Sequence, residues 1–241
     1  MQPDLAPQLQ AGLAQMGVSA SPAQMENWVA FLGLLYRWNR VHSLTAVPEH
    51  EQAVNRHLLD ALRVWPHLLQ VIQRHPGPGA AEILDVGSGT GVPAIPLAIA
   101  LPQTHWTLVE RVARKAAFLR QAIGRLGLAD RVRVAQSDVR DLTRAVGYEI
   151  ILSRAFAALP RFVEWTQHLA HEQTQWAYLA GRLERIPGLQ AEHRLALSQP
   201  IALAGLSTEA GQRLVQAVAL GSQSDRHLVW VSNRPVASRP N

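Results

Sequence analysis

The chain has 241 residues, a formal charge of +5 and no cysteine, and 48% of its residues are hydrophobic. This length accommodates one large domain with a substantial core, and the hydrophobic content argues against extensive disorder. The lack of cysteine excludes disulfides, thiolate metal ligands and cysteine nucleophiles, so we expect a cytoplasmic protein. No apolar run is long enough to span a membrane, and the first residues lack the pattern of a signal peptide, so we expect no membrane partner.

Lys115 is the single lysine among the 23 basic residues, and the others are arginines. Arginine pairs bidentately with phosphate and stacks on bases, so this composition permits binding to nucleic acid. The composition bias of a high-GC genome would replace lysine by arginine in the same way. Composition alone leaves both explanations open.

Two helices are predicted ahead of the first strand. Ser21 and Gln24 form a capping box around a proline at the first helical position, and apolar residues then recur at helical spacing. A second helix is predicted over Glu49–Trp65, where Arg56 and Asp60 lie one turn apart on a polar face. That face is either a surface ion-pair ladder or the border of a cofactor site.

A glycine-rich turn follows the apolar stretch Ile83–Val86, which is typical of a buried strand. Gly87, Gly89 and Gly91 lie at alternate positions, and an apolar segment able to start a helix comes next. A dinucleotide fingerprint needs G-x-G-x-x-G and a P-loop needs Gly-Lys-Ser/Thr, and neither fits. The spacing G-x-G-x-G after an acid resembles the cofactor loop of class I S-adenosylmethionine-dependent methyltransferases; the alternative is a β–α turn without a ligand.

Strands and helices then alternate, which predicts a doubly wound, mostly parallel sheet. The predicted strands are 104–109, 132–135, 148–152 and 175–179, and the predicted helices are 114–126 and 159–169. Segments 193–203 and 227–231 are predicted to finish the sheet as antiparallel strands. Residues 204–221 show no interpretable pattern, and the residues from 233 onward are expected to fray.

Charged residues stand where the predicted strands end, namely Asp85, Glu110, Asp138 and Arg154. The carboxyl ends of parallel strands form one edge of the sheet, where such folds bind ligands. Glu110 follows the glycines at the distance at which an acid reaches ribose hydroxyls, and Asp138 is placed to accept from an adenine amino group. The alternative for each acid is a solvated loop carboxylate.

Other constellations of reactive residues are incomplete. A zinc motif starting at His171 fails because Gln175 stands where the second histidine should be. His168 would share a helix face with His171, but no third ligand is evident, so we expect no metal site. The nucleophile elbow G-x-S-x-G is absent, which removes support for a hydrolase.

Four sequence motifs follow one another along the chain: Trp38-Asn39 with Leu44-Thr45, Arg56-His57-Leu58-Leu59-Asp60-Ala61-Leu62, Leu84 through Pro93, and Ser153-Arg154-Ala155-Phe156-Ala157. Through these motifs, residues 38–182 resemble the bacterial 16S ribosomal RNA guanine-N7 methyltransferases, the glucose-inhibited-division protein B family. The chain departs from the family pattern at Glu110-Arg111, where the family has aspartate-serine, and at Asp138-Val139-Arg140, where its acid lies two positions later. Ala180 replaces a family lysine.

The resemblance implies a class I methyltransferase fold, which is an α/β, Rossmann-like, doubly wound and mostly parallel seven-stranded sheet with an N-terminal helical extension. The extension is expected over 1–75, the S-adenosylmethionine-binding domain over 82–232, and a disordered tail over 233–241. The implied reaction is methyl transfer from S-adenosylmethionine to N7 of a guanine in 16S ribosomal RNA. The implied partner is that RNA or the small ribosomal subunit, and the expected oligomeric state is a monomer.

The resemblance also assigns residues. Gly87, Val92, Val139, Arg140 and Arg154 match positions of cofactor contact in the family, and they join Asp85, Gly89, Glu110 and Asp138 in the predicted cofactor site. Arg154 is further expected to position the reactants. The predicted RNA contacts are Arg114, Lys115, Arg182 and His57. Two alternatives are a class I methyltransferase acting on a small molecule or protein, and a non-catalytic nucleotide-binding module.

Overall fold

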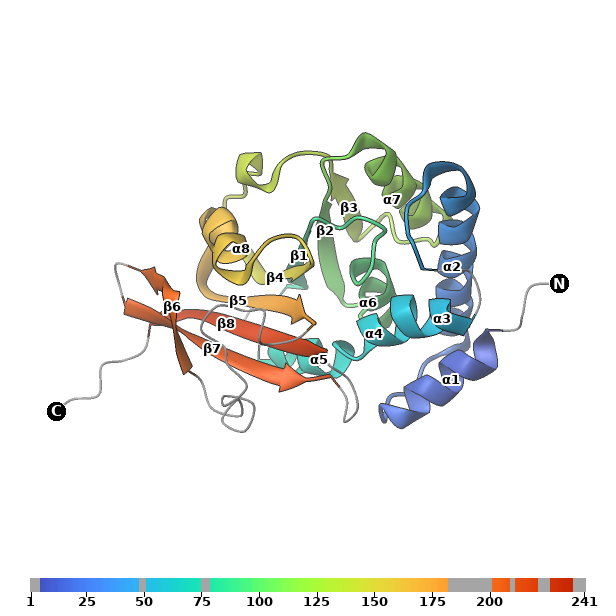
Figure 1. Ribbon diagram of the computed structural model, residues 1–241, viewed down its shortest axis with the longest axis horizontal. Helices are drawn as coiled ribbons and strands as arrows, with labels where there is room; N and C mark the ends of the chain where they lie inside the picture. The colour runs from blue at the N-terminus through green and yellow to red at the C-terminus, as the bar shows by residue number, and fades with distance from the viewer. Residues whose placement is uncertain are drawn as a thin grey trace. The chain divides into compact units, whose positions relative to one another are not determined.

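The computed structural model describes residues 5–47, 51–74, 79–181, 201–208, 211–220 and 226–235 (Figure 1). The chain folds as two compact units. The first comprises Met1–Ala81 with Gly87–Asp138, and the second comprises Glu82–Val86 with Val139–Asn241. The chain passes from the first unit to the second and back within a few residues, at strand β1 (Ala81–Val86).

The first unit contains two parallel strands, in which Trp106 is paired with Val132, and a set of helices (Figure 1). The strands are β2 (Thr104–Val109) and β3 (Val132–Ala135). The helices are α1 (Ala6–Gln15), α2 (Pro22–His42), α3 (Glu51–Ala53), η1 (Val54–Leu59), α4 (Asp60–Leu62), α5 (Trp65–Gln73), α6 (Ala94–Ala100) and α7 (Ala113–Arg125). None of the helices within the described ranges has both the length and the hydropathy of a membrane-spanning segment.

Helix α2 begins at the predicted capping box. The Gln24 backbone N–H donates to Ser21 Oγ at 3.3 Å, and the Ser21 N–H donates to Gln24 Oε1 at 2.9 Å. These two bonds satisfy N–H groups that the first helical turn leaves without partners. The same turn also contacts α6, because Gln24 Nε2 donates to the carbonyl oxygen of Ile99 at 3.1 Å.

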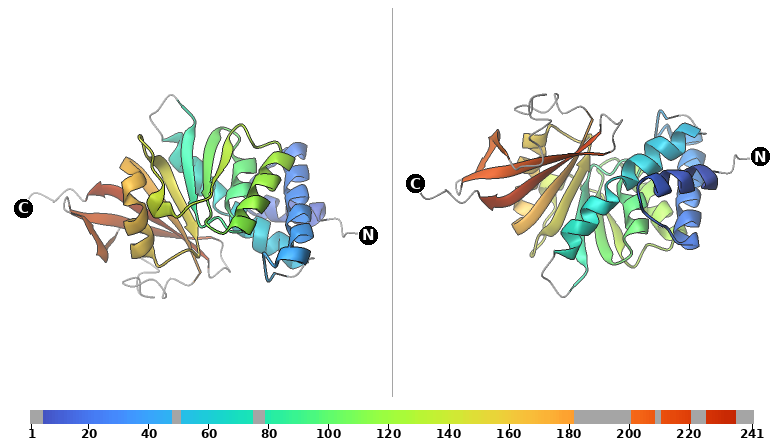
Figure 2. Two further views of the ribbon diagram at one scale, coloured as in Figure 1. Left: turned by 90° about the horizontal axis from the view of Figure 1, so that it is seen from above. Right: turned by 90° about the horizontal axis from the view of Figure 1, so that it is seen from below.

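The indole of Trp28 joins α2 to the helix that follows the glycine turn. Trp28 is fully buried, and its Nε1 donates to the carbonyl oxygen of Pro96 at 3.0 Å. Helix α6 has only seven residues, all buried, so its carbonyl groups depend on partners from neighbouring elements. Figure 2 shows α2 running beside α7, where the rings of Phe31 and Trp38 pack against Phe118. The N-terminal helices therefore share a core with α6 and α7.

We predict that Trp28→Phe destabilises the protein more than Trp38→Phe does. The first change leaves the buried Pro96 carbonyl without a donor, which costs ~1–3 kcal/mol. Trp38 also loses a hydrogen bond, to Gln121, but that bond is exposed to water, which can replace it. Urea unfolding of both variants measures the difference, and equal losses of unfolding free energy would contradict the role given to Trp28.

The second predicted helix is not continuous. The sequence predicts one helix over Glu49–Trp65, whereas the structure has α3, a π-helical segment η1, α4, and then α5. The π-helical hydrogen bonds insert one additional residue into a turn, which allows both His57 and Leu58 to be buried. On the polar face, Asp60 forms an ion pair with Arg63 at 2.7 Å.

The second unit contains six strands, which neighbour one another in the order β1-β4-β5-β8-β7-β6 (Figure 1). Strands β1, β4 and β5 are parallel, and β8, β7 and β6 continue the sheet antiparallel. The elements of this unit after β1 are η2 (Val139–Asp141), β4 (Tyr148–Arg154), α8 (Leu159–Thr166), η3 (Gln167–Leu169), β5 (Ala170–Ala180), β6 (Ile201–Thr208), β7 (Gly211–Ala219) and β8 (His227–Pro235).

The antiparallel end of the sheet differs from the sequence prediction in detail. The prediction of a strand at 227–231 is confirmed by β8, which continues to Pro235, beyond the start of the expected tail at residue 233. The region 204–221, which shows no pattern in the sequence, contains most of β6 and all of β7. The part of the predicted strand at 193–200 lies outside the described residues.

The predicted fold class is confirmed in its coarse form, an α/β Rossmann-like fold with mostly parallel strands. The number of strands is not the predicted seven, because the described residues form two strands in the first unit and six in the second. The difference arises at β6 and β7, which carry no strict alternation that would identify them in the sequence.

Candidate cofactor site

The glycine turn is anchored on the end of β2. The N–H groups of Gly87 and Ser88 both donate to the carbonyl oxygen of Val109, each at 3.0 Å. Gly87, Gly89 and Gly91 all have positive φ, of 71°, 56° and 76°. A Cβ on Gly91 would lie 2.6 Å from the end of the Ile95 side chain, which would have to shift, and the positive φ favours glycine at this position.

Glu110 is the residue that closes this turn. Its Oε2 accepts from the Gly89 N–H at 2.9 Å, and its Oε1 accepts from the Val112 N–H at 2.8 Å. The side chain is 6% exposed. Val112 is the N-cap residue of α7, so one carboxylate connects the glycine turn to the start of that helix. The family's aspartate is shorter by one methylene than the glutamate that spans these two N–H groups here.

The carboxylate also has the capacity to bind a diol. An ionised carboxylate has about four acceptor positions, and the two backbone N–H groups use two of them. Two positions therefore remain for the two hydroxyls of a ribose. The residues present thus fit the predicted nucleoside, although the sequence analysis did not predict the backbone hydrogen bonds of Glu110.

The other predicted cofactor residues are distributed over both units. In the first unit, Val92 is buried directly after the glycine turn, and Asp138 is half-buried beyond the end of β3. In the second unit, Asp85 is 1% exposed within β1 and Val139 is buried. Arg140 is exposed, and Arg154 is half-exposed at the end of β4. Their roles toward a cofactor stay predictions.

The end of β4 is fixed within the second unit. The Ser153 hydroxyl is fully buried and donates to the carbonyl oxygen of Val86 at 3.2 Å, which ties the last residues of β4 and β1 together. Ser153 precedes Arg154 directly, so this bond fixes the backbone from which the arginine extends. Arg154 therefore projects from the carboxyl end of parallel strands, where α/β folds bind ligands.

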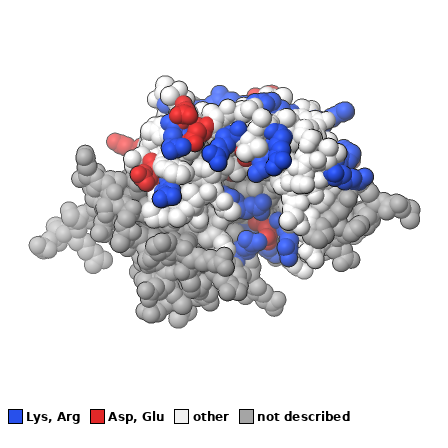
Figure 3. All heavy atoms as spheres, turned by 45° about the horizontal axis from the view of Figure 1, so that its top comes forward, with Lys and Arg blue, Asp and Glu red and all other residues white. Residues whose placement is uncertain are grey.

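Two of the predicted RNA contacts begin helix α7. Arg114 is exposed and Lys115 is half-exposed in its first turn, which contains no acidic residue. Cations are unfavourable at a helix N-terminus because the helix dipole is positive there, so this arrangement favours an external anion such as phosphate. Figure 3 shows basic side chains distributed over one face of the molecule, with acidic side chains in fewer places. Arg182 lies outside the described residues.

His57, the fourth predicted RNA contact, is inside the first unit. Its side chain is 3% exposed, its ring lies 6.1 Å from that of Tyr36, and its Nε2 is 3.4 Å from Thr45 Oγ1. Thr45 Oγ1 accepts from the Val47 N–H at 3.1 Å, and the Thr45 N–H donates to Oδ1 of Asn39, in α2, at 2.8 Å. The His57 side chain is thus packed inside the first unit, and its contact with RNA stays a prediction.

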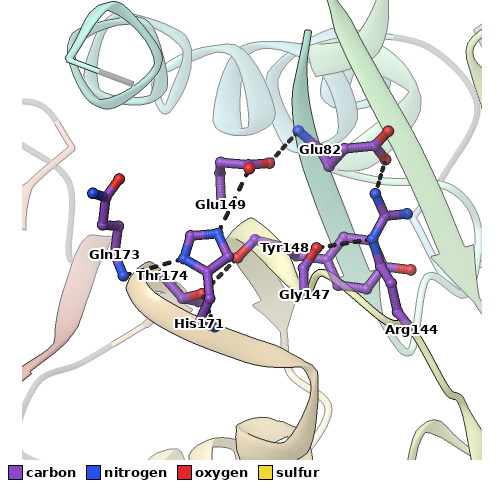
Figure 4. Close-up of polar contacts among 8 residues, drawn as sticks. All are labelled: Glu82, Arg144, Gly147, Tyr148, Glu149, His171, Gln173 and Thr174. Carbon is purple, nitrogen blue, oxygen red and sulfur yellow. Dashed lines mark hydrogen bonds and ion pairs between the residues drawn. The ribbon is translucent and has the colours of Figure 1, made fainter. Parts of the chain in front are cut away.

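A polar cluster that the sequence analysis did not identify lies at the opposite, amino ends of β1 and β4 (Figure 4). Glu149 accepts from the Glu82 N–H at 2.6 Å and lies 3.6 Å from His171 Nε2. Arg144 pairs with Glu82 at 3.3 Å and donates to the Gly147 carbonyl at 2.8 Å. These contacts hold the strand starts together and are structural.

The histidines of the failed zinc motif are not on one helix. His168 lies in η3 and its Nε2 is 3.0 Å from the carbonyl oxygen of Leu142, whereas His171 lies in β5. Within the described ranges, no group of three or more His, Asp or Glu side chains is arranged to hold a metal ion.

Solved structures define the class of fold. The chain is similar to a putative O-methyltransferase from Klebsiella pneumoniae, with a TM-score of 0.54 and 15% identity over 94% of this chain and 96% of that one. It is also similar to MtNAS, solved as a mutant in complex with S-adenosylmethionine, with a TM-score of 0.52 and 15% identity over 85% of this chain and 73% of that one. The fold is therefore that of the class I methyltransferases.

Sequence relatives define the family. The family described as rRNA small subunit methyltransferase G (GidB) matches residues 24–215. Ribosomal RNA small subunit methyltransferase G of Neisseria meningitidis strain Z2491 is 39% identical over 74% of this chain and 84% of its own length. The protein of the same name from Methylobacillus flagellatus is 34% identical over 94% of this chain and 97% of its own length. The chain belongs to the rRNA small subunit methyltransferase G family.

We predict that Glu110→Ala both lowers thermal stability and weakens binding of S-adenosylmethionine. The change removes two charge-assisted hydrogen bonds to backbone N–H groups, each worth ~1.5–3 kcal/mol, together with the acceptor for the ribose. Glu110→Gln is expected to behave similarly, because an amide has only one oxygen to offer the two N–H groups.

Calorimetry of cofactor binding and thermal unfolding measure both effects. The matched control is Glu26→Ala, which removes an exposed acid of α2 in the same unit and is expected to change neither quantity. Wild-type cofactor affinity in Glu110→Ala would reject the ribose role, and a wild-type melting temperature would reject the structural one.

Proposed function

We propose that this protein transfers a methyl group from S-adenosylmethionine to N7 of a guanine in small-subunit ribosomal RNA. The observation that carries the proposal is the glycine turn closed by Glu110, in a chain that belongs to the rRNA small subunit methyltransferase G family. The relatives named above are ribosomal RNA methyltransferases, which favours RNA over a metabolite or protein substrate. We also propose that it acts as a monomer in the cytoplasm.

The cofactor would be held by groups with distinct tasks. The N–H groups of the glycine turn and the Glu110 carboxylate suit the nucleoside, and Asp85, Gly87, Gly89 and Val92 belong to the strand and turn around it. Asp138, Val139 and Arg140 follow β3, where an adenine ring is expected in this class. When bound, S-adenosylmethionine would supply the methyl group from its sulfonium, and the neutral thioether of S-adenosylhomocysteine would be the leaving group.

The chemistry needs orientation more than proton transfer. Guanine N7 carries no proton and has a free lone pair, so no side chain has to act as a general base. The protein instead has to hold N7 in line with the bond between sulfur and methyl carbon, and such orientation is worth ~7–11 kcal/mol. Arg154 is the residue proposed to position the reactants, and Arg114 and Lys115 at the start of α7 are proposed to hold RNA phosphate.

The proposal is tested by the modification state of the ribosomal RNA. Deletion of the gene is expected to remove one 7-methylguanosine from 16S RNA, and the purified protein should restore it on subunits from the deletion strain. Parallel incubations with a metabolite panel separate this activity from that of a small-molecule methyltransferase. Full 7-methylguanosine content in the deletion strain would overturn the proposal.

We predict that Arg154→Ala abolishes most methyl transfer while circular dichroism and thermal melting stay close to wild type. Arg154→Lys is expected to restore only part of the activity, because a point charge does not replace a planar guanidinium that donates two parallel hydrogen bonds. Arg125→Ala, at the exposed end of α7, is the control and should remain active. Wild-type turnover by folded Arg154→Ala on small subunits would reject the assignment.

A further inference from the structure

Four side chains of the second unit form a stacked group, which we call the Trp165 cluster: Arg140, Phe156, Arg161 and Trp165. The guanidinium carbon of Arg140 lies 5.0 Å from the centroid of the Trp165 ring, and that of Arg161 lies 5.6 Å from it. Phe156 meets the same ring edge-on, with centroids 5.8 Å apart and planes at 73°. Both arginines are exposed and both aromatic rings are half-buried.

The cluster draws on three segments that are separate in the sequence. Arg140 lies in η2, Phe156 in the turn after β4, and Arg161 and Trp165 one helical turn apart on α8. The turn after β4 leaves the carboxyl end of a parallel strand, where ligand-binding residues of α/β proteins gather. The Trp165 cluster therefore lies where α/β proteins have ligand-binding surfaces.

The turn that carries Phe156 has an unusual backbone. Ala155 adopts φ 56°, a left-handed conformation that is unfavourable for a residue with a Cβ. The following residues are held by the Tyr178 hydroxyl, which donates to the carbonyl oxygen of Ala157 at 3.0 Å. Burial raises the pKa of Tyr178, which keeps this donor protonated. The backbone conformation of Ala155 before Phe156 and the hydrogen bond to Ala157 after it therefore hold Phe156 in its position against Trp165.

Two guanidinium groups lie near the one ring of Trp165. A single cation over an aromatic ring gives the favourable contact, and a second cation nearby adds repulsion. The Arg161 side chain is exposed, and a guanidinium has five N–H donors, so it can contact the ring and also donate to a phosphate.

We propose that the Trp165 cluster binds an unpaired nucleotide of the RNA substrate, with its phosphate on the edge of Arg161 and its base stacked on the guanidinium and aromatic surfaces. This inference rests on the proposed function, because it assigns a contact for that RNA. Unpaired RNA is recognised in this way, by bases that stack on aromatic side chains or arginine planes.

The charges around the cluster favour stacking over long-range attraction. Asp141 follows Arg140 in η2 and Glu164 precedes Trp165 on α8, and both acids are exposed. These acids offset the two arginines, so the cluster does not act as a broad basic patch. Its affinity for RNA has to come from directed hydrogen bonds and from ring contacts, which distinguishes it from Arg114 and Lys115 on α7.

The test measures the binding of full-length protein variants to a fluorescein-labelled, single-stranded oligoribonucleotide and to deproteinised 16S RNA by anisotropy at several salt concentrations. Arg161→Gln is expected to weaken binding about fivefold, and Trp165→Leu about tenfold, near the low end of what one stacked base contributes. Arg161→Lys should recover little of the loss, although it keeps the charge. The control Arg125→Gln removes one exposed positive charge outside the cluster and should bind within about twofold of wild type.

Salt dependence and cofactor binding complete the design. Arg161→Gln should reduce the slope of log affinity against log salt by ~0.7, the value for one phosphate of a single strand, and Trp165→Leu should leave that slope unchanged. Affinity for S-adenosylmethionine, measured by calorimetry, should stay at the wild-type value in Arg161→Gln. Circular dichroism and thermal melting check the fold of Trp165→Leu, because Trp165 also contacts Arg140, a predicted cofactor residue. Wild-type affinity for S-adenosylmethionine would also show that the Arg161→Gln variant is folded.

Two results would overturn the inference. One is wild-type RNA affinity in both Arg161→Gln and Trp165→Leu, and the other is an equal loss in Arg125→Gln, which would indicate diffuse charge. Failure of the proposed function would give a different result, because wild-type protein would then transfer no methyl group to small subunits. Loss of RNA affinity in the cluster variants would support the inference even in that case.

Discussion

The carboxylate of Glu110 is the group on which the candidate site depends. It accepts from Gly89 in the glycine turn and from Val112 at the start of α7, and its own N–H donates to the Ala135 carbonyl of β3 at 3.1 Å. Three segments that meet at the end of β2 are therefore connected through one residue. A buried carboxylate is stable only when its oxygens have donors, so the turn and the helix start are constrained by the need to satisfy it.

This constraint connects the cofactor residues to the proposed RNA residues within the first unit. The glycine turn leads into α6, and α7 carries Arg114 and Lys115 in its first turn. Helix α2 packs on both of these helices, through Trp28 on α6 and through Phe31 on α7. The N-terminal helices thus support the elements that carry the site, although none of their own side chains has a proposed contact with the cofactor.

The second unit has a different arrangement of polar groups at the two ends of its parallel strands. At the amino ends, Glu82, Glu149 and Arg144 satisfy one another and the backbone, so they leave little capacity for a ligand. At the carboxyl ends, Arg154 is half-exposed and the two arginines of the Trp165 cluster are exposed. The contrast follows from the parallel sheet, whose connections on the carboxyl side are the ones that vary with function.

Local sequence patterns determined much of what is seen here. The capping box at Ser21, the strands that end at Val109 and Ala135, and the glycine turn after Val86 are set by hydrogen bonds, burial and backbone freedom within a few residues. The sequence motifs that resemble the family also indicated the class of fold and the family, because each motif consists of residues adjacent in the chain.

Only the tertiary structure decided the roles that depend on distant partners. The hydrogen bond from Gly89 to Glu110, the burial of His57, and the contact of Arg140 with Trp165 all involve segments that the sequence separates. A side chain's exposure and the identity of its partner are set by which elements pack against it. The sequence therefore determined which functional side chains the protein has, and the packing of distant segments determined which of them are exposed and which partners they contact.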